Sequence, residues 1–113
     1  MERKTFNKLV RDKIPELLDK NGGETEIEIL DNEKYIECLL EKLKEECEEV
    51  ISAESRENLA EELADLLEVM KAISETHDID FAEVEKIRLA KNKKRGGFGG
   101  KIFLKSSNVV NKI

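Results

Sequence analysis

Two groups of acidic residues have the spacing of metal ligands on helices. They read Glu45-Glu46-Cys47-Glu48-Glu49 and Glu62-Leu63-Ala64-Asp65. In each group two carboxylates stand three residues apart, so on an α-helix both point from one face. Glu46 and Glu49 facing Glu62 and Asp65 would offer the hard oxygen ligands that Mg²⁺ or Mn²⁺ prefers. The spacing therefore predicts a divalent-metal site.

The position of these acids relative to the apolar residues supports a cation rather than ordinary solvation. At about 100° per residue, Glu46 borders the apolar stripe of its helix and Glu62 falls inside the stripe of the next. A carboxylate aimed at a core is costly unless it is paired or bound to a cation. The alternative is a salt bridge to an inward-reaching lysine or arginine. No Lys or Arg lies within the two stripes, so a metal is the expected counter-charge.

Helices must position these acids, and the sequence predicts one short helix and three long ones. Apolar residues at helical spacing, a proline suited to a first turn and Gly-Gly stops give their limits. The third long helix has an Asp80 N-cap with Glu83 at the capping-box position. The expected ranges are 15–20, 32–53, 56–77 and 81–95.

Two short strands are expected beside the helices. Residues 24–30 alternate polar and apolar side chains, and residues 101–104 form a second candidate strand. Because isolated strands are marginal, we expect the two to pair with each other and to pack on helices. The fold class is thus mainly α, a helical bundle in a single domain 1–113 with a frayed tail at 106–113.

Composition agrees with a helical protein. Charged residues make up 41% of the 113 residues and aromatic residues only 4%, a mix that favours helices. There is no apolar run of transmembrane length and no signal-peptide core at the N-terminus. Cys38 and Cys47 lie nine residues apart on one predicted helix, where a disulfide is sterically implausible, so both are expected to be reduced. We therefore expect a cytoplasmic protein that does not associate with a membrane.

The charges are segregated along the chain. Residues 1–13 carry five basic and two acidic side chains, residues 86–113 carry nine basic and no acidic ones, and the middle holds 24 acids and six bases. An acidic middle argues against a partner that is a nucleic acid polymer. It suits a metal centre flanked by cations that grip phosphates. The candidate phosphate-binding residues are Lys8, Arg11, Lys13, Lys91, Lys94 and Arg95.

Together the motifs resemble those of a known family. The two acidic groups look like the signature of the MazG-like all-α nucleoside triphosphate pyrophosphohydrolases. The flanks, Asn7-Lys8-Leu9-Val10-Arg11-Asp12-Lys13-Ile14-Pro15 and Lys94-Arg95-Gly96-Gly97-Phe98, resemble the phosphoribosyl-ATP pyrophosphohydrolase-like subgroup proposed to hydrolyse noncanonical nucleotides. The similarity covers roughly residues 5–105. Many family members carry glycine where this chain has Ala64.

The resemblance implies a metal site and a reaction. It implies that Glu46, Glu49, Glu62 and Asp65 bind Mg²⁺, with Mn²⁺ as a substitute. It further implies hydrolysis of a nucleoside triphosphate between the α- and β-phosphates, which yields a nucleoside monophosphate and pyrophosphate. We take Glu49 as the first candidate for the general base and Glu45 as the second, because a base must lie beside the attacking water.

Other interpretations remain open. One is phosphoribosyl-ATP pyrophosphohydrolase of histidine synthesis, and another is a non-catalytic helical module that binds a nucleotide or a protein partner. The Leu-rich stripes exceed what three long helices can bury, so we expect a homodimer or a larger homo-oligomer.

Overall fold

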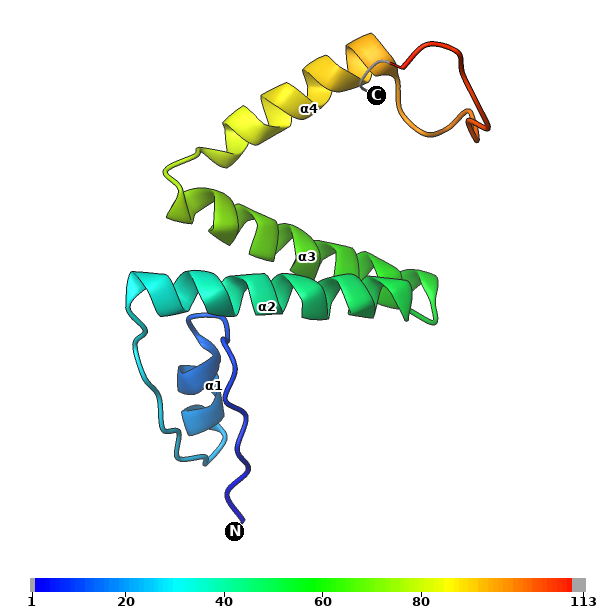
Figure 1. The fold of residues 1–113 in the computed structure, drawn as a ribbon. Helices are drawn as coiled ribbons and strands as arrows, with labels where there is room; N and C mark the ends of the chain where they lie inside the picture. Colours follow the sequence, from blue (N-terminus) through cyan, green and yellow to red (C-terminus); the bar gives the residue numbers. More distant parts are fainter. Residues whose placement is uncertain (1, 111–113) are drawn as a thin grey trace. The chain divides into compact units, whose positions relative to one another are not determined.

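The protein is mainly α-helical, as its sequence predicts. The computed structural model describes residues 2–110, which form four helices (Figure 1): α1 (Ile14–Lys20), α2 (Asn32–Ile51), α3 (Arg56–Thr76) and α4 (Phe81–Arg95). The chain divides into two compact units, Met1–Phe81 and Ala82–Ile113, and each is described by itself. Whether the chain is one domain stays a prediction.

Side-chain caps fix where the two long helices begin. The Asp31 carboxylate accepts a hydrogen bond of 2.9 Å from the backbone N–H of Lys34, and the Ser55 hydroxyl accepts one of 3.1 Å from the N–H of Asn58. Both bonds satisfy a donor that has no partner within the helix. The predicted starts at residues 32 and 56 are therefore confirmed, while both helices end slightly earlier than predicted.

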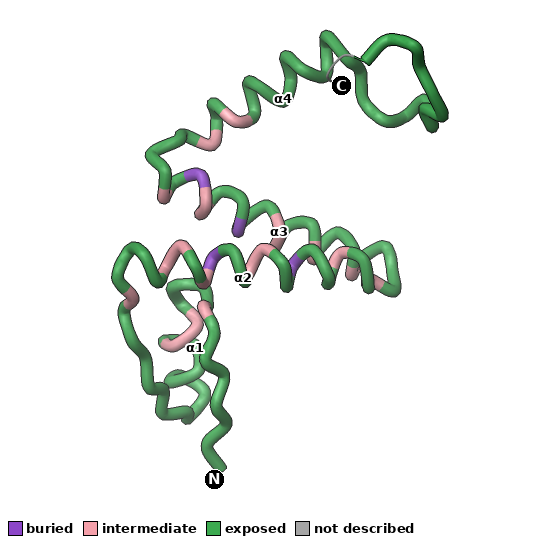
Figure 2. Tube along the Cα trace, in the orientation of Figure 1, coloured by how far each residue is buried: buried purple, intermediate pink, exposed green. Residues whose placement is uncertain are grey.

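The first unit is organised by the pairing of α2 with α3. The two helices run antiparallel along each other and are joined by the turn 52–55 (Figure 1). Four side chains are buried in this hairpin, and they occur on both helices (Figure 2): Leu39, Glu46, Val69 and Ser74. The buried set thus includes one carboxylate.

Much of the apolar surface along the stripes of α2 and α3 is exposed in this chain. The exposed apolar residues of the hairpin include Leu40, Ile51, Leu59, Leu63, Leu67 and Met70. Two helices bury only the stripe along their line of contact, so the apolar residues beside that stripe remain on the surface. The hairpin therefore leaves several large apolar side chains exposed to solvent in this chain.

The two expected strands do not form, which corrects the sequence-based prediction. Among residues 2–110 the structure has no strand, and Ile29 and Ile102 are 87% and 89% exposed. Thr25 at the start of 24–30 hydrogen-bonds the Asp19 carboxylate, which ties this segment to the end of α1. Lys101 has a φ of 57°, outside the extended region. Alternating polarity without a paired neighbour is insufficient for a strand.

The second unit consists of most of α4 and the segment that follows it. The helix ends at Arg95, before Gly96, whose φ of 81° is the left-handed conformation typical of helix ends. Residues 106–110 of the expected tail are exposed and have no helix or strand, and residues 111–113 lie outside the described residues. None of the helices described here has the length and apolar character needed to cross a membrane.

Candidate metal centre

Three of the four predicted metal ligands come together between α2 and α3. Glu46 of α2 and Glu62 and Asp65 of α3 each direct a carboxylate oxygen so that the three oxygens lie within 4.8 Å of one another. We call these three residues the acidic cluster. The spacing of Glu62 and Asp65 puts both on one face of α3, and the pairing of the helices brings Glu46 to that face.

Glu49, the fourth predicted ligand, does not join the acidic cluster. It lies one turn beyond Glu46 on α2, and its side chain is exposed. It is nevertheless close enough to act on Glu62 electrostatically, because its charge contributes to the shifted pKa of that residue. Glu45 is exposed as well.

The most deeply buried acid is Glu46, whereas the sequence placed Glu62 further inward. The side chain of Glu46 is 12% exposed, and Glu62 and Asp65 are half-buried. Leu43 and Val50 flank Glu46 on its face of α2, and both are half-buried against the hairpin. A border position on the apolar stripe thus becomes an interior position once α3 packs against it.

Two cations approach the acidic cluster, although the sequence predicted none within the apolar stripes. Lys42 Nζ lies 3.7 Å from Glu46 Oε1 and 3.8 Å from Glu45 Oε2. Arg11 Nη2 lies 2.7 Å from Asp65 Oδ1 and donates a hydrogen bond to it. The spacing of Lys42 and Glu46, four residues apart on a helix, could have indicated the first contact. No local pattern indicates the second, because it joins distant parts of the chain.

Glu62 has carboxylates rather than a cation as its charged neighbours. Partial burial raises the pKa of Glu62 above its usual range, and the negative charges of Glu49, Asp65 and Glu46 raise it further. The Asn58 amide opposes this rise in pKa by donating a hydrogen bond of 3.4 Å from Nδ2 to Glu62 Oε1. The charged form of Glu62 is therefore disfavoured, and a bound cation would remove this electrostatic cost.

Asn58 is a site residue that the sequence reasoning missed. Its amide oxygen accepts a hydrogen bond of 3.4 Å from the backbone N–H of Glu54, and its amide nitrogen donates to Glu62. The side chain thus connects the turn 52–55 with the acidic cluster. The signal in the sequence is its position four residues before Glu62, on the same face of α3.

The donor set of the acidic cluster fits a hard divalent cation. Its members supply carboxylate oxygens alone, from two helices that hold them at mutual distances within 4.8 Å. Oxygen ligands suit Mg²⁺ and Mn²⁺, whereas softer metals prefer thiolate or imidazole ligands. Glu62 and Asp65 are also partly exposed to solvent, so a substrate oxygen or a water could complete the coordination of a cation.

The predicted phosphate-binding residues fall into two sets. Arg11 alone among them is paired with the acidic cluster, while Lys8 and Lys13 are exposed nearby in the chain. The amino group of Lys8 lies 5.9 Å from the centre of the Phe6 ring. The second set, Lys91, Lys94 and Arg95, is exposed on α4 in the second unit. Phosphate contacts by these residues stay predictions.

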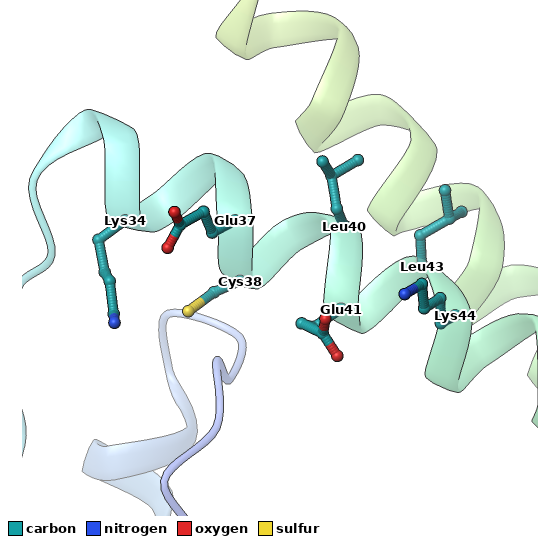
Figure 3. Close-up of a pocket in the computed structure, with 7 residues that line it drawn as sticks. All are labelled: Lys34, Glu37, Cys38, Leu40, Glu41, Leu43 and Lys44. Carbon is teal, nitrogen blue, oxygen red and sulfur yellow. The ribbon is translucent and has the colours of Figure 1, made fainter.

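A separate hollow on α2 lacks the acids of the cluster. Figure 3 shows two lysines, two glutamates, two leucines and a cysteine along this helix, with the leucines pointing toward the neighbouring helix. The lining residues are Lys34, Glu37, Cys38, Leu40, Glu41, Leu43 and Lys44. Because the side chains of this hollow are those of an ordinary charged helix surface, the acidic cluster is the stronger candidate for the functional site.

Comparisons with known proteins identify one family. The profile of the MazG nucleotide pyrophosphohydrolase domain matches residues 32–97, which is more than half of the chain. This match contains α2, α3 and α4, and with them every member of the acidic cluster. Comparisons with curated proteins and with solved structures give no significant match.

Proposed function

Because the chain belongs to the MazG nucleotide pyrophosphohydrolase family, we propose that it is a Mg²⁺-dependent enzyme that hydrolyses nucleoside triphosphates to nucleoside monophosphates and pyrophosphate. The observation that carries this proposal is the acidic cluster, in which three carboxylate oxygens lie within 4.8 Å of one another. We further propose that the substrates are noncanonical ribo- or deoxyribonucleotides, because both flanking motifs resemble the phosphoribosyl-ATP pyrophosphohydrolase-like subgroup proposed to hydrolyse such nucleotides in cellular house-cleaning.

Glu46, Glu62 and Asp65 are the residues that would hold the metal. When bound, Mg²⁺ supplies positive charge that offsets the charge of the triphosphate. The electrostatic state of the cluster supports this role, because the neighbouring carboxylates raise the pKa of Glu62 and a cation would relieve their repulsion. Lys42 and Arg11 offset part of the charge on Glu46 and Asp65, and a bound cation would offset the repulsion that remains at Glu62.

Glu49 is the proposed general base. Its carboxylate stands beside the acidic cluster but outside the group of three, so it is free to accept a proton from the attacking water. The water oxygen attacks the α-phosphorus, the bond to the oxygen bridging to the β-phosphorus breaks, and pyrophosphate leaves. Glu45 is the weaker candidate for this role because Lys42 Nζ lies 3.8 Å from its carboxylate.

The basic residues outside the hairpin complete the proposal. Lys8, Arg11 and Lys13 in the first unit, with Lys91, Lys94 and Arg95 on α4, would contact the triphosphate. We also propose a homodimer or larger homo-oligomer, supported by the exposed leucines of the hairpin. The free thiols of Cys38 and Cys47 support a cytoplasmic location.

A product analysis tests the proposed function. Purified protein is incubated with ordinary and damaged nucleoside triphosphates and with phosphoribosyl-ATP, in Mg²⁺ and in excess chelator. Release of pyrophosphate with a nucleoside monophosphate, lost in chelator, supports the proposal. Release of inorganic phosphate in place of pyrophosphate would show that the protein cleaves a different bond and would contradict the proposal. Turnover restricted to phosphoribosyl-ATP would favour the enzyme of histidine synthesis, and no turnover of any substrate would favour a binding module.

A further inference from the structure

Arg11 makes a contact that its expected role in phosphate binding does not explain. Its guanidinium donates from Nη2 to Asp65 Oδ1 at 2.7 Å, across 54 positions of the chain. The pairs Lys20–Glu16 and Lys42–Glu46, in contrast, join residues four apart on one helix. The Arg11 pair therefore links the segment before α1 to the acidic cluster on the hairpin.

The Arg11 guanidinium and a divalent cation would compete for the same carboxylate. Asp65 has an oxygen within 4.8 Å of oxygens of Glu46 and Glu62, so a metal in the cluster would draw on Asp65 as a ligand. Two cations on one carboxylate repel each other at short range. In the structure described here, the guanidinium supplies part of the counter-charge that a metal would bring.

The Arg11–Asp65 ion pair requires little free energy to break. The side chains of Arg11 and Asp65 are 58% and 45% exposed, and ion pairs this accessible to water add little stability. The backbone of Arg11 is held independently, because its carbonyl oxygen accepts a hydrogen bond of 3.0 Å from Ile14 N–H at the start of α1. The backbone of Arg11 therefore keeps its place at the start of α1 when the guanidinium leaves Asp65.

We propose that Arg11 is a displaceable counter-ion: its guanidinium would leave Asp65 when Glu46, Glu62 and Asp65 hold a divalent cation, and the freed side chain would then bind the phosphates of the substrate. This inference rests on the proposed function and adds two points to it. The guanidinium leaves Asp65 before it binds phosphate, and Arg11 couples metal binding to nucleotide binding. A guanidinium with unpaired donors fits phosphate oxygens in two-pronged fashion. Arg11 thus opposes metal binding and favours nucleotide binding.

Opposite changes in two affinities test the proposal. Mn²⁺ binding is measured by calorimetry at fixed ionic strength, and binding of an α,β-methylene nucleoside triphosphate is measured in saturating Mg²⁺. We expect Arg11→Ala to bind Mn²⁺ about three- to tenfold more tightly and the analogue about tenfold more weakly. Lys20→Ala removes a positive charge from α1, away from the cluster, and should change either affinity less than about twofold.

The outcomes separate this proposal from the proposed function. Weaker or unchanged Mn²⁺ binding by folded Arg11→Ala overturns the displaceable counter-ion while leaving pyrophosphate release by the unaltered protein intact. Absence of Mn²⁺ binding by the unaltered protein overturns both proposals. Circular dichroism confirms helical content.

Two further measurements make the test independent of the alanine variant. In the unaltered protein, Mg²⁺ should shift the Arg11 Nε–Hε signal in ¹⁵N nuclear magnetic resonance spectra, and an unmoved signal would contradict displacement. Arg11→Lys keeps the charge but loses the planar fork. It should keep Mn²⁺ affinity within about twofold and weaken analogue binding about threefold, and unchanged analogue binding would count against the proposal.

Discussion

Glu62 on α3 and Glu85 on α4 respond to their surroundings in opposite directions. Partial burial and three neighbouring carboxylates raise the pKa of Glu62. The Arg88 guanidinium, which donates to Glu85 from Nε at 2.9 Å, lowers the pKa of Glu85. Both are glutamates on long helices, yet only Glu85 has a basic partner one turn away. A carboxylate held against the negative charge of its neighbours points to a ligand site, whereas an exposed carboxylate paired with a basic residue on its own helix is typical of a solvated surface.

The largest difference is expected in catalysis. Glu62→Gln removes a carboxylate of the acidic cluster, and we expect pyrophosphate release to fall by roughly 100-fold or more, since even supporting residues of metal sites contribute 10–100-fold. Glu85→Gln removes a carboxylate of the same type from α4 and should retain activity within about twofold. Initial rates with a saturating triphosphate and Mg²⁺ measure both. Equal losses in the two variants would contradict the distinction between the two regions.

A smaller effect is expected from the amide that holds Glu62. Asn58→Ala removes the hydrogen bond to Glu62 Oε1, and we expect Mn²⁺ affinity to fall about tenfold, the range for residues that orient metal ligands. Ser55→Ala is the matched control, because it removes the cap of α3 that binds the Asn58 N–H but leaves the amide side chain in place. It should lower stability by about 1 kcal/mol with little effect on affinity. Calorimetric titration and thermal unfolding distinguish the two results.

The same contrast shows what the sequence could and could not predict. Helix limits and the meeting of Glu46, Glu62 and Asp65 followed from caps, from 3.6-residue periodicity and from the pairing of two adjacent helices. These rules concern single helices and the contact between two helices that are adjacent in the sequence. Arg11 reaches Asp65 through the path of the segment before α1, which no local rule determines. Thus the meeting of these three carboxylates was predictable, but one of their counter-ions was not.

The error over the strands has a related cause. Alternating polarity in 24–30 predicts a strand only if another strand pairs with it, and pairing is a property of the whole fold. The structure instead ties Thr25 to Asp19. Burial was also overestimated in the hairpin, where leucines at helical spacing such as Leu63 and Leu67 remain about half exposed. Periodicity indicates which face is apolar, but it does not supply the element that covers that face.

Stability in the absence of metal should reverse the ranking of the two glutamates. Glu62→Gln removes a charge that Glu49, Asp65 and Glu46 oppose, so we expect the unfolding temperature of the metal-free protein to rise by roughly a few degrees. Glu85→Gln loses the ion pair with Arg88 and one of the two oxygens that accept from it, and it should leave the unfolding temperature unchanged or slightly lower. Saturating Mg²⁺ should stabilise the unaltered protein and not Glu62→Gln. A lower unfolding temperature for metal-free Glu62→Gln would show that its carboxylate supports the fold.

The smallest effect is a difference in how the two glutamates make stability depend on pH. The folded-state pKa of Glu62 is raised, so the folded protein binds this proton more tightly than the unfolded chain does. The contribution of Glu62 to stability is therefore fully present below its unfolded pKa and is lost as pH rises through the raised folded value. Glu85 has a lowered folded pKa, so its contribution is present above its unfolded pKa and is lost as pH falls through the lowered value. Denaturant unfolding of the metal-free protein across the acidic range should lose the first slope in Glu62→Gln and the second in Glu85→Gln. Because Mg²⁺ would compete with the proton on Glu62, saturating metal should also abolish the first slope and leave the second, and a metal-independent Glu62 slope would contradict a cation at the acidic cluster.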